Sequence, residues 1–221
     1  MNGLNDVSFL GWLIYIVQNK VDRVVNYLAH AYLSFENNEI LIGNMISDFV
    51  KGKTKFNFPL IIQKGIILHR AIDAFTDVHP VTKLAKQVFK PVVGLYSGAF
   101  VDVVYDHFLA TDEKEFPMKA LERFAENTYE VLNSYTFLLP EKFNIMLPFM
   151  SNQNWLLNYR FTQGIENSFG GIFKRAKYLE KNADVFHRFT VNYDFFYNCY
   201  QQFFPALKEF AFAEYNTLME D

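Results

Sequence analysis

Three ionisable side chains recur at every fourth position in one apolar stretch of this 221-residue chain, the run from Gly65 to Asp77. They are His69, Asp73 and Asp77, and on a helix they would share one face, about one turn apart. Burying such a face without partners is costly, and a divalent cation suits imidazole and carboxylate groups together. The spacing therefore predicts a metal site. A structural His–Asp pair with a solvated Asp near the helix end is the alternative interpretation.

Further histidines and carboxylates lie on neighbouring predicted helices. His30 and Asp48 stand in apolar segments, where a core histidine and a helix cap are the alternatives. Asp102 and Asp106 lie four residues apart in the apolar segment 100–109, where two carboxylates repel one another and resist burial. A cation should neutralise them. A mixed nitrogen and oxygen site of this kind suits Mn²⁺, Fe or Zn²⁺ better than Ca²⁺.

Arg70 directly follows the first histidine of the central run and could neutralise a carboxylate or bind a phosphate. The chain has no P-loop and no dinucleotide-binding motif, and neither Ser47 nor Ser97 lies in a nucleophile-elbow sequence. A metal that generates hydroxide and stabilises a phosphoryl group is the chemistry that fits His and Asp clusters with a nearby arginine. The residues by themselves indicate this reaction class and no specific substrate.

Composition favours one well-packed domain in a reducing, cytoplasmic setting. The chain is 51% hydrophobic and 18% aromatic, and its length allows about 70% of the unfolded surface to be buried. The single Cys199 cannot form an internal disulfide. A net charge of −3 argues against nucleic acid or an anionic membrane as the main partner. The apolar stretch 7–17 follows Asp6 and is too short to span a bilayer, so we expect neither a signal peptide nor membrane insertion.

Apolar residues recur every three or four positions and no alternating strand pattern is found, so the sequence predicts an all-α fold. We expect a single helical domain with a C-terminal helical half packed on the N-terminal half. Prolines predict helix starts near residues 59, 80 and 117, and a break is expected before Pro205. The predicted helices cover residues 7–18, 21–35, 39–51, 59–76, 80–90, 92–110, 116–134, 140–148, 152–168, 170–180 and 184–215.

The same residues resemble those of the bacterial acyl carrier protein phosphodiesterases, also called holo-acyl carrier protein hydrolases. The matching segments are ordered and evenly spaced from about Asn26 to near the C-terminus. They are Asn26–His30, Gly43-Asn44, Asp48–Val50 with Gly52, Gly65 with His69-Arg70, Ile72-Asp73, Thr76-Asp77, Asp102, Asp106–Leu109 and, more thinly, Trp155-Leu156, Tyr159-Arg160 and Phe204-Pro205.

The resemblance implies an enzyme with an HD-domain-like helical core, related to the HD-domain metal-dependent phosphohydrolases. Such an enzyme would remove the 4′-phosphopantetheine arm from the serine of holo acyl carrier protein, with Mn²⁺ as the favoured metal. The residues implied to bind the metal or orient the attacking water are His30, Asp48, His69, Asp73 and Asp106. Arg70 would bind a phosphodiester oxygen, His107 or His79 would protonate the leaving serine oxygen, and Asp77 and Asp102 would orient the histidines.

Three features depart from the family pattern. The adjacent His-Asp doublet of the HD superfamily is absent, because Asp106-His107 has the reverse order. Ala71 stands where a second basic residue is expected. The first 24 residues have no counterpart, so we predict an extension over 1–24, a phosphodiesterase-like domain over 25–221, and translation that starts at Val25.

Acyl carrier proteins are small and strongly acidic, which gives two lysine clusters a predicted role in steering the partner. Two alternatives stay open. The first is a metallophosphohydrolase for a nucleotide or another small phosphodiester, and the second is a non-catalytic helical binding module whose His and Asp residues form buried pairs. A solvated face is the alternative for the lysines. The clusters are Lys51, Lys53 and Lys55, and Lys83, Lys86 and Lys90.

Overall fold

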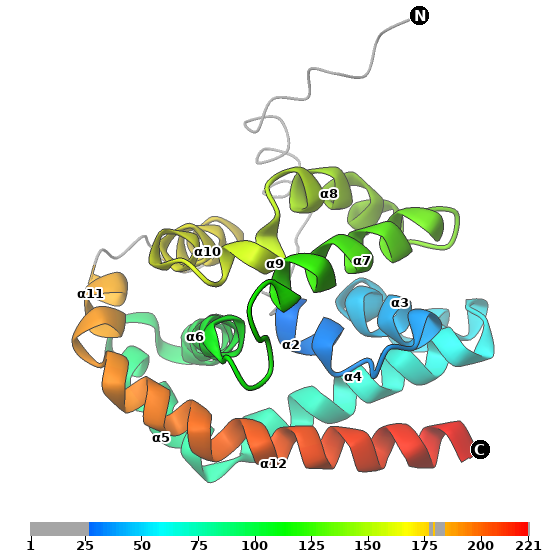
Figure 1. The fold of residues 1–221 in the computed structure, drawn as a ribbon. Helices are drawn as coiled ribbons and strands as arrows, with labels where there is room; N and C mark the ends of the chain where they lie inside the picture. Colours follow the sequence, from blue (N-terminus) through cyan, green and yellow to red (C-terminus); the bar gives the residue numbers. More distant parts are fainter. Residues whose placement is uncertain (1–26, 177–178, 180–183, 221) are drawn as a thin grey trace, which may run out of the picture.

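The computed structural model describes residues 27–176, 179 and 184–220, and these form an all-α fold without a β-strand (Figure 1). The predicted fold class is confirmed. The predicted helix 7–18, the start of helix 21–35 and the extension 1–24 lie outside the described residues. The elements are α2 (Tyr27–Tyr32), α3 (Asn38–Ile46), η1 (Ser47–Phe49), η2 (Gly52–Asn57), α4 (Leu60–Val78), α5 (Pro80–Val93), η3 (Gly94–Tyr96), α6 (Ser97–Thr111), α7 (Ala120–Ser134), α8 (Glu141–Asn152), α9 (Trp155–Asn158), α10 (Thr162–Arg175), α11 (Asp184–Val191) and α12 (Tyr193–Glu220), where η denotes a 3₁₀ helix.

Prolines mark the starts of two helices as predicted, since Pro59 precedes α4 and α5 begins at Pro80. The expected break before Pro205 is wrong, because α12 continues through that residue and the chain breaks at Asn192 instead. A proline removes one backbone hydrogen bond from a helix interior. The buried side chains of Phe203 and Phe204 fix this turn of α12 against the core, which offsets that loss.

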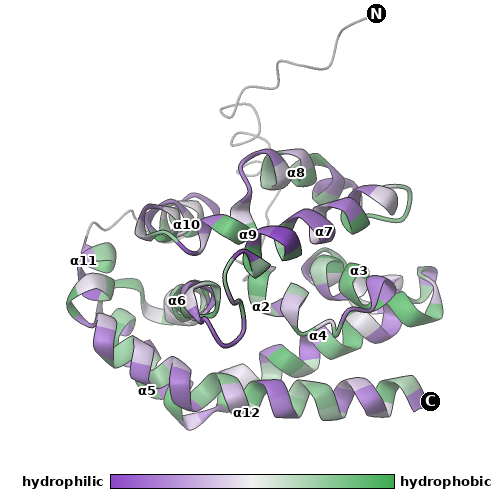
Figure 2. Ribbon diagram, in the orientation of Figure 1, coloured by the Kyte–Doolittle hydropathy of each residue, from purple (hydrophilic) through white to green (hydrophobic). Residues whose placement is uncertain are grey.

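The helices lie in three layers (Figure 1). The lowest in this view contains α5, α4 and the long α12, which packs against both of the others. The middle layer holds α6, α2 and α3, and helices α7 to α10 cover it from above. Figure 2 shows alternating hydrophilic and hydrophobic bands along α12, as expected for a helix with one face on the core.

Two glycines bring α3 and α4 into backbone contact. A Cβ atom added at Gly43 would lie 2.1 Å from the carbonyl oxygen of Ile62, and one added at Gly65 would lie 2.4 Å from that of Ile40. Any larger residue at either position would therefore push the helices apart. This close approach sets the last turn of α3 against the middle of α4, where the predicted metal ligands lie.

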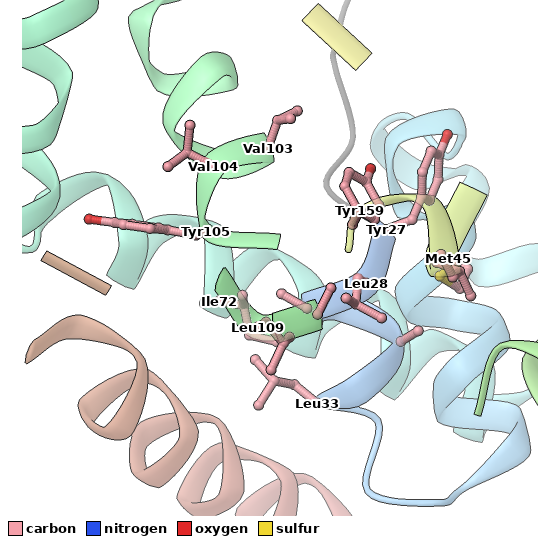
Figure 3. Packing of buried hydrophobic residues seen from close by; sticks show 14 of the residues in the cluster. Tyr27, Leu28, Leu33, Met45, Ile72, Val103, Val104, Tyr105, Leu109 and Tyr159 are labelled. Atoms are coloured by element: carbon pink, nitrogen blue, oxygen red, sulfur yellow. The ribbon is translucent and has the colours of Figure 1, made fainter. Parts of the chain in front are cut away.

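A continuous apolar core fixes the helices that carry the histidines and carboxylates. Leu28 of α2, Ile72 of α4 and Leu109 of α6 are at most 1% exposed and belong to this core (Figure 3). Each of these residues lies within three positions of a predicted site residue. Small displacements of the three helices are resisted, because close-packed interiors transmit strain.

One apolar helical stretch, Pro80–Thr111, has the length and the mean hydropathy, 1.3, of a possible membrane span. The chain turns at Gly94, whose φ is 54°, and divides this stretch into α5 and α6. The two helices pack against one another. The stretch is therefore a packed helix pair in this fold.

Candidate metal centre

Three predicted residues meet at one point between α2 and α4. The Nε2 atom of His30 lies 3.3 Å from Oδ1 of Asp73, and Nε2 of His69 lies 3.3 Å from Oδ2 of the same carboxylate. The two imidazole rings are stacked, with centroids 3.8 Å apart and an interplanar angle of 16°. One possible ligand atom from each residue lies within 4.8 Å of the others. The structure thus brings together residues that are 43 positions apart in the sequence (73 − 30).

Both Nε2 atoms of this group lack a satisfied hydrogen bond. They are buried, and no described residue meets them with hydrogen-bond geometry, although Asp73 is within ion-pair distance of each. Buried polar atoms without partners are rare because each costs free energy. Two imidazole nitrogens and a carboxylate oxygen form a donor set that suits a transition metal or Zn²⁺. His30, His69 and Asp73 therefore fit the metal that the sequence predicts.

Asp48 lies at the edge of the same group, on the 3₁₀ turn η1. Its Oδ1 atom is 3.6 Å from Nε2 of His69, and its side chain is 8% exposed. Arg70, the next residue of α4, donates from Nη2 to the carbonyl oxygen of Val50 at 2.8 Å. This bond joins α4 to the chain just after η1 and so supports the position of Asp48.

The electrostatics of the group favour one bound proton. Burial, followed by the charge of His69, lowers the pKa of His30. Burial alone would lower the pKa of His69 too, but the nearby carboxylates of Asp48 and Asp73 raise it to about 9. Burial would raise the pKa of Asp73, and the two imidazoles outweigh it and lower that pKa well below its usual range. A cation that binds here must displace the proton of His69.

Asp102 on α6 is half-buried and electrostatically coupled to the group. Burial, and next the charge of Asp73, raise the pKa of Asp102 well above its usual range, and Lys86 opposes the rise. Asp77 is 72% exposed and accepts a 2.7 Å ion pair from Lys86. Of the two residues predicted to orient the histidines, Asp77 is thus engaged by a lysine at the surface.

Asp106, another predicted metal ligand, is not among the three grouped residues and has backbone partners on α2. Its side chain is fully buried, and its oxygens accept hydrogen bonds from the backbone N–H groups of Leu28 at 3.0 Å and Ala29 at 2.9 Å. Burial raises the pKa of Asp106 to about 7, against the effect of these donors. The carboxyl therefore caps the start of α2, the helix that carries His30.

The two histidines predicted as proton donors make their contacts with other residues. Nδ1 of His107 lies 2.8 Å from the carbonyl oxygen of Tyr159, and its Nε2 lies 2.9 Å from the hydroxyl oxygen of Tyr193. The ring of His79 packs edge-on to Phe203 with centroids 5.1 Å apart, beyond the end of α4. His79 follows Asp73 by six positions, which corresponds to about 9 Å along the helix axis.

Sequence reasoning assigned no role to Asn44, which contacts both histidines. Its Oδ1 atom is 2.9 Å from Nδ1 of His30, and its backbone oxygen is 2.7 Å from Nδ1 of His69. The residue is fully buried. The sequence does place Asn44 beside a glycine in an otherwise apolar helix, where an unpaired amide side chain would be costly, and this could have indicated a role for it.

A basic loop and a shallow hollow adjoin η1. Lys51 and Lys53 are exposed, Lys55 lies 5.1 Å from the ring centroid of Phe56, and Phe56 is 63% exposed. The hollow has a volume of about 340 Å³. It is lined by Phe49, Val50, Thr54, Asn57, Phe58, Leu138, Leu139 and Pro140.

Comparisons with known proteins identify the family of the chain. The family model described as acyl carrier protein phosphodiesterase matches residues 25–207. The acyl carrier protein phosphodiesterase of Photorhabdus laumondii is 29% identical over 188 residues, which cover 85% of this chain and 95% of the relative. Those of Enterobacter sp. and Escherichia coli O6:H1 are each 28% identical, over 83% and 85% of this chain and 95% and 97% of the relatives. No solved structure matches. The chain belongs to the acyl carrier protein phosphodiesterase family.

Proposed function

We propose that this chain is a metal-dependent phosphodiester hydrolase that releases 4′-phosphopantetheine from holo acyl carrier protein and leaves the apo form. The relatives that cover most of the chain carry the name acyl carrier protein phosphodiesterase, which supports the substrate. The observation that carries the metal dependence is the pair of buried Nε2 atoms, on His30 and His69, that face Asp73 and find no hydrogen-bond partner in the described part of the chain. Residues 25–221 would form the enzyme domain, in the cytoplasm, where it would act in fatty acid metabolism.

His30, His69 and Asp73 would hold the metal, and Asp48 would contribute a further oxygen beside His69. Mn²⁺ is the favoured ion, and the mixed nitrogen and oxygen donors also accept Fe or Zn²⁺. Bound there, the ion would polarise the phosphoryl group and lower the pKa of a water molecule.

The remaining roles fall to residues around the group. Hydrolysis adds the water oxygen to phosphorus, breaks the bond from phosphorus to the serine oxygen, and delivers a proton to that oxygen. Arg70 would donate hydrogen bonds to a phosphodiester oxygen. Asp102 would supply the proton, since burial and the charge of Asp73 hold its pKa well above the usual range. Of the two histidines that the family resemblance implied for this step, His107 has hydrogen-bond partners at both ring nitrogens, and His79 lies beyond the end of α4 with its ring against Phe203.

The basic loop around η2 would receive the acidic carrier. Lys51 follows Asp48 by three residues, which places their Cα atoms at most about 11 Å apart. The exposed Phe56 adds an apolar contact beside the lysines. In the second cluster Lys86 is paired with Asp77, so that less of its charge is available to a partner. Electrostatic complementarity of this kind acts mainly on the association rate.

Replacing Lys53 by Glu tests the loop. We expect kcat/KM for holo acyl carrier protein to fall several-fold at low salt, while turnover of a small chromogenic phosphodiester is unchanged. The exposed Lys119 is the control for Lys→Glu charge reversal outside this loop. Equal losses on both substrates, or an equal loss in Lys119→Glu, would contradict the docking role of Lys53.

The decisive experiment measures the mass of holo acyl carrier protein after incubation with the purified protein and Mn²⁺, with and without chelator. We expect loss of the phosphopantetheine mass, abolished by chelator and by Asp48→Ala. Hydrolysis of a small phosphodiester beside an unchanged carrier would favour the small-substrate hydrolase. No activity, together with stability that ignores chelators, would favour the binding module.

A further inference from the structure

Asn44 is a single contact point between the two histidines of the metal centre. It lies in the last turn of α3, where backbone carbonyls lack their usual partner four residues on. Its side-chain oxygen contacts His30 and its backbone oxygen contacts His69, at 2.9 and 2.7 Å. In both histidines the contacted atom is Nδ1, and Nε2 is turned toward Asp73.

The neighbours of Asn44 determine which way its amide points. Nδ2 lies 2.8 Å from the carbonyl oxygen of His30, which can only accept. The same Nδ2 lies 3.2 Å from Oγ of Ser34, whose own hydrogen is donated to the carbonyl oxygen of His30 at 2.9 Å. Both neighbours are therefore acceptors, Nδ2 is the amino group, and Oδ1 is the atom that faces the ring of His30.

Hydrogen-bond chemistry then determines the protonation of both rings. Oδ1 and the backbone oxygen of Asn44 have no proton to donate, so Nδ1 of His30 and Nδ1 of His69 must each carry one. A neutral imidazole protonated at Nδ1 has its lone pair on Nε2. We propose that Asn44 is a positioning residue that holds His30 and His69 with Nδ1 protonated, so that both Nε2 atoms face Asp73 and are left for a cation once His69 gives up its second proton.

The glycine contact between α3 and α4 explains how one residue reaches both rings. Gly43 precedes Asn44, and Gly65 lies one turn before His69 on α4. Because these glycines allow backbone contact, the carbonyl oxygen of Asn44 comes within 2.7 Å of a ring on the neighbouring helix. The side-chain contact and the backbone contact of Asn44 can be tested separately. A side-chain substitution removes the contact with His30 and leaves the backbone contact with His69.

The test is a two-bond ¹H–¹⁵N correlation spectrum of the imidazoles in the metal-free full-length protein at pH 8, for wild type and Asn44→Ala. We expect His30 to change from the pure Nδ1–H tautomer to a mixture, while His69 keeps its Nδ1 proton. Mn²⁺ affinity, measured by calorimetry, should fall about 10- to 100-fold. Asn133→Ala is the matched control. It removes a half-buried hydrogen bond from the side-chain amide of Asn133 to the carbonyl oxygen of Tyr129 on α7, and it should leave both readouts unchanged.

Asn44→Asp keeps the proposal testable if Asn44→Ala fails to fold. It retains an acceptor for Nδ1 of His30, so His30 should keep the Nδ1–H tautomer. Two results would overturn the role of Asn44. One is an unchanged His30 spectrum in Asn44→Ala, and the other is loss of the Nδ1–H tautomer of His30 in Asn44→Asp. The inference rests on the proposed metal centre, but the spectra need no metal. Failure of wild type to bind Mn²⁺ would contradict the proposed function and leave the tautomer result standing.

Discussion

Two groups of histidine and aspartate lie on neighbouring helices and have different surroundings. On α4 and α2, the rings of His30 and His69 meet Asp73 through Nε2 atoms that lack hydrogen-bond partners among the described residues. On α6, the oxygens of Asp106 accept two backbone hydrogen bonds, and both ring nitrogens of His107 have partners. The first group has donor atoms available for a ligand, and the second completes the packing of the protein itself.

This difference shows that residue type and spacing do not distinguish a ligand site from a structural one. Both groups combine histidine with aspartate in apolar helices, and burial alone penalises both. What separates them is the number of donors and acceptors that reach them from other elements. A buried polar group that is already satisfied has nothing to gain from a metal, whereas an unsatisfied one does.

The largest effect should come from removing the carboxylate that the two histidines share. In Asp73→Ala we expect hydrolysis of holo acyl carrier protein to fall by on the order of 10³-fold, because the donor set loses its oxygen. The stabilisation by Mn²⁺, about 2.7 kcal/mol at a concentration 100 times Kd in wild type, should disappear with it. Activity assays and thermal melts with and without Mn²⁺ measure the two quantities. A full Mn²⁺ shift in Asp73→Ala would remove the distinction between the groups.

Replacing Asp106 should change the stability of the fold and leave metal binding intact. Its usual pKa of 3.8 is raised to about 7 by burial, so between these values the folded state binds more protons than the unfolded state. The free energy of unfolding contributed by this group is therefore complete below about pH 4 and is lost as the pH rises through about 7. Its slope is at most about 1.4 kcal/mol per pH unit.

Asp106→Asn should remove that pH-dependent contribution while Mn²⁺ still raises the melting temperature. Urea denaturation between pH 4 and 8 measures the slope in both proteins. An identical slope in wild type and variant would show that Asp106 is not held as described. A loss of the Mn²⁺ shift without a loss of helix content would return Asp106 to the metal centre.

Asp102 lies one turn before Asp106 on α6. We expect Asp102 to act in the reaction and Asp106 to act in packing. If Asp102 protonates the leaving serine oxygen, Asp102→Asn should lower kcat for holo acyl carrier protein about 100-fold. A chromogenic phosphodiester with an acidic phenol as leaving group needs no such proton and should lose little. Comparing kcat on the two substrates is the measurement, and equal losses would exclude the proton-donor role.

The all-α class and the shared face of α4 could be predicted from the sequence because both depend on local periodicity. His69 and Asp73 are one turn apart, and that spacing survives whatever the rest of the fold does. The role of Asp106 could not be predicted, since its partners Leu28 and Ala29 lie 78 and 77 residues away. The role of Asn44 could not be predicted for the same reason. Its contacts with the histidines depend on how closely α3 approaches α2 and α4.

The smallest effect, and the sharpest control, should come from Tyr193→Phe. The carbonyl oxygen of Tyr159 requires a proton on Nδ1 of His107, so Nε2 accepts from the hydroxyl of Tyr193. Removing that hydroxyl leaves one buried acceptor unsatisfied, which should cost about 1 kcal/mol in the free energy of unfolding. Mn²⁺ affinity and the hydrolysis of holo acyl carrier protein should stay within twofold of wild type. If they fell as far as in Asp73→Ala, His107 would be part of the metal centre, and the contrast between the two groups would be wrong.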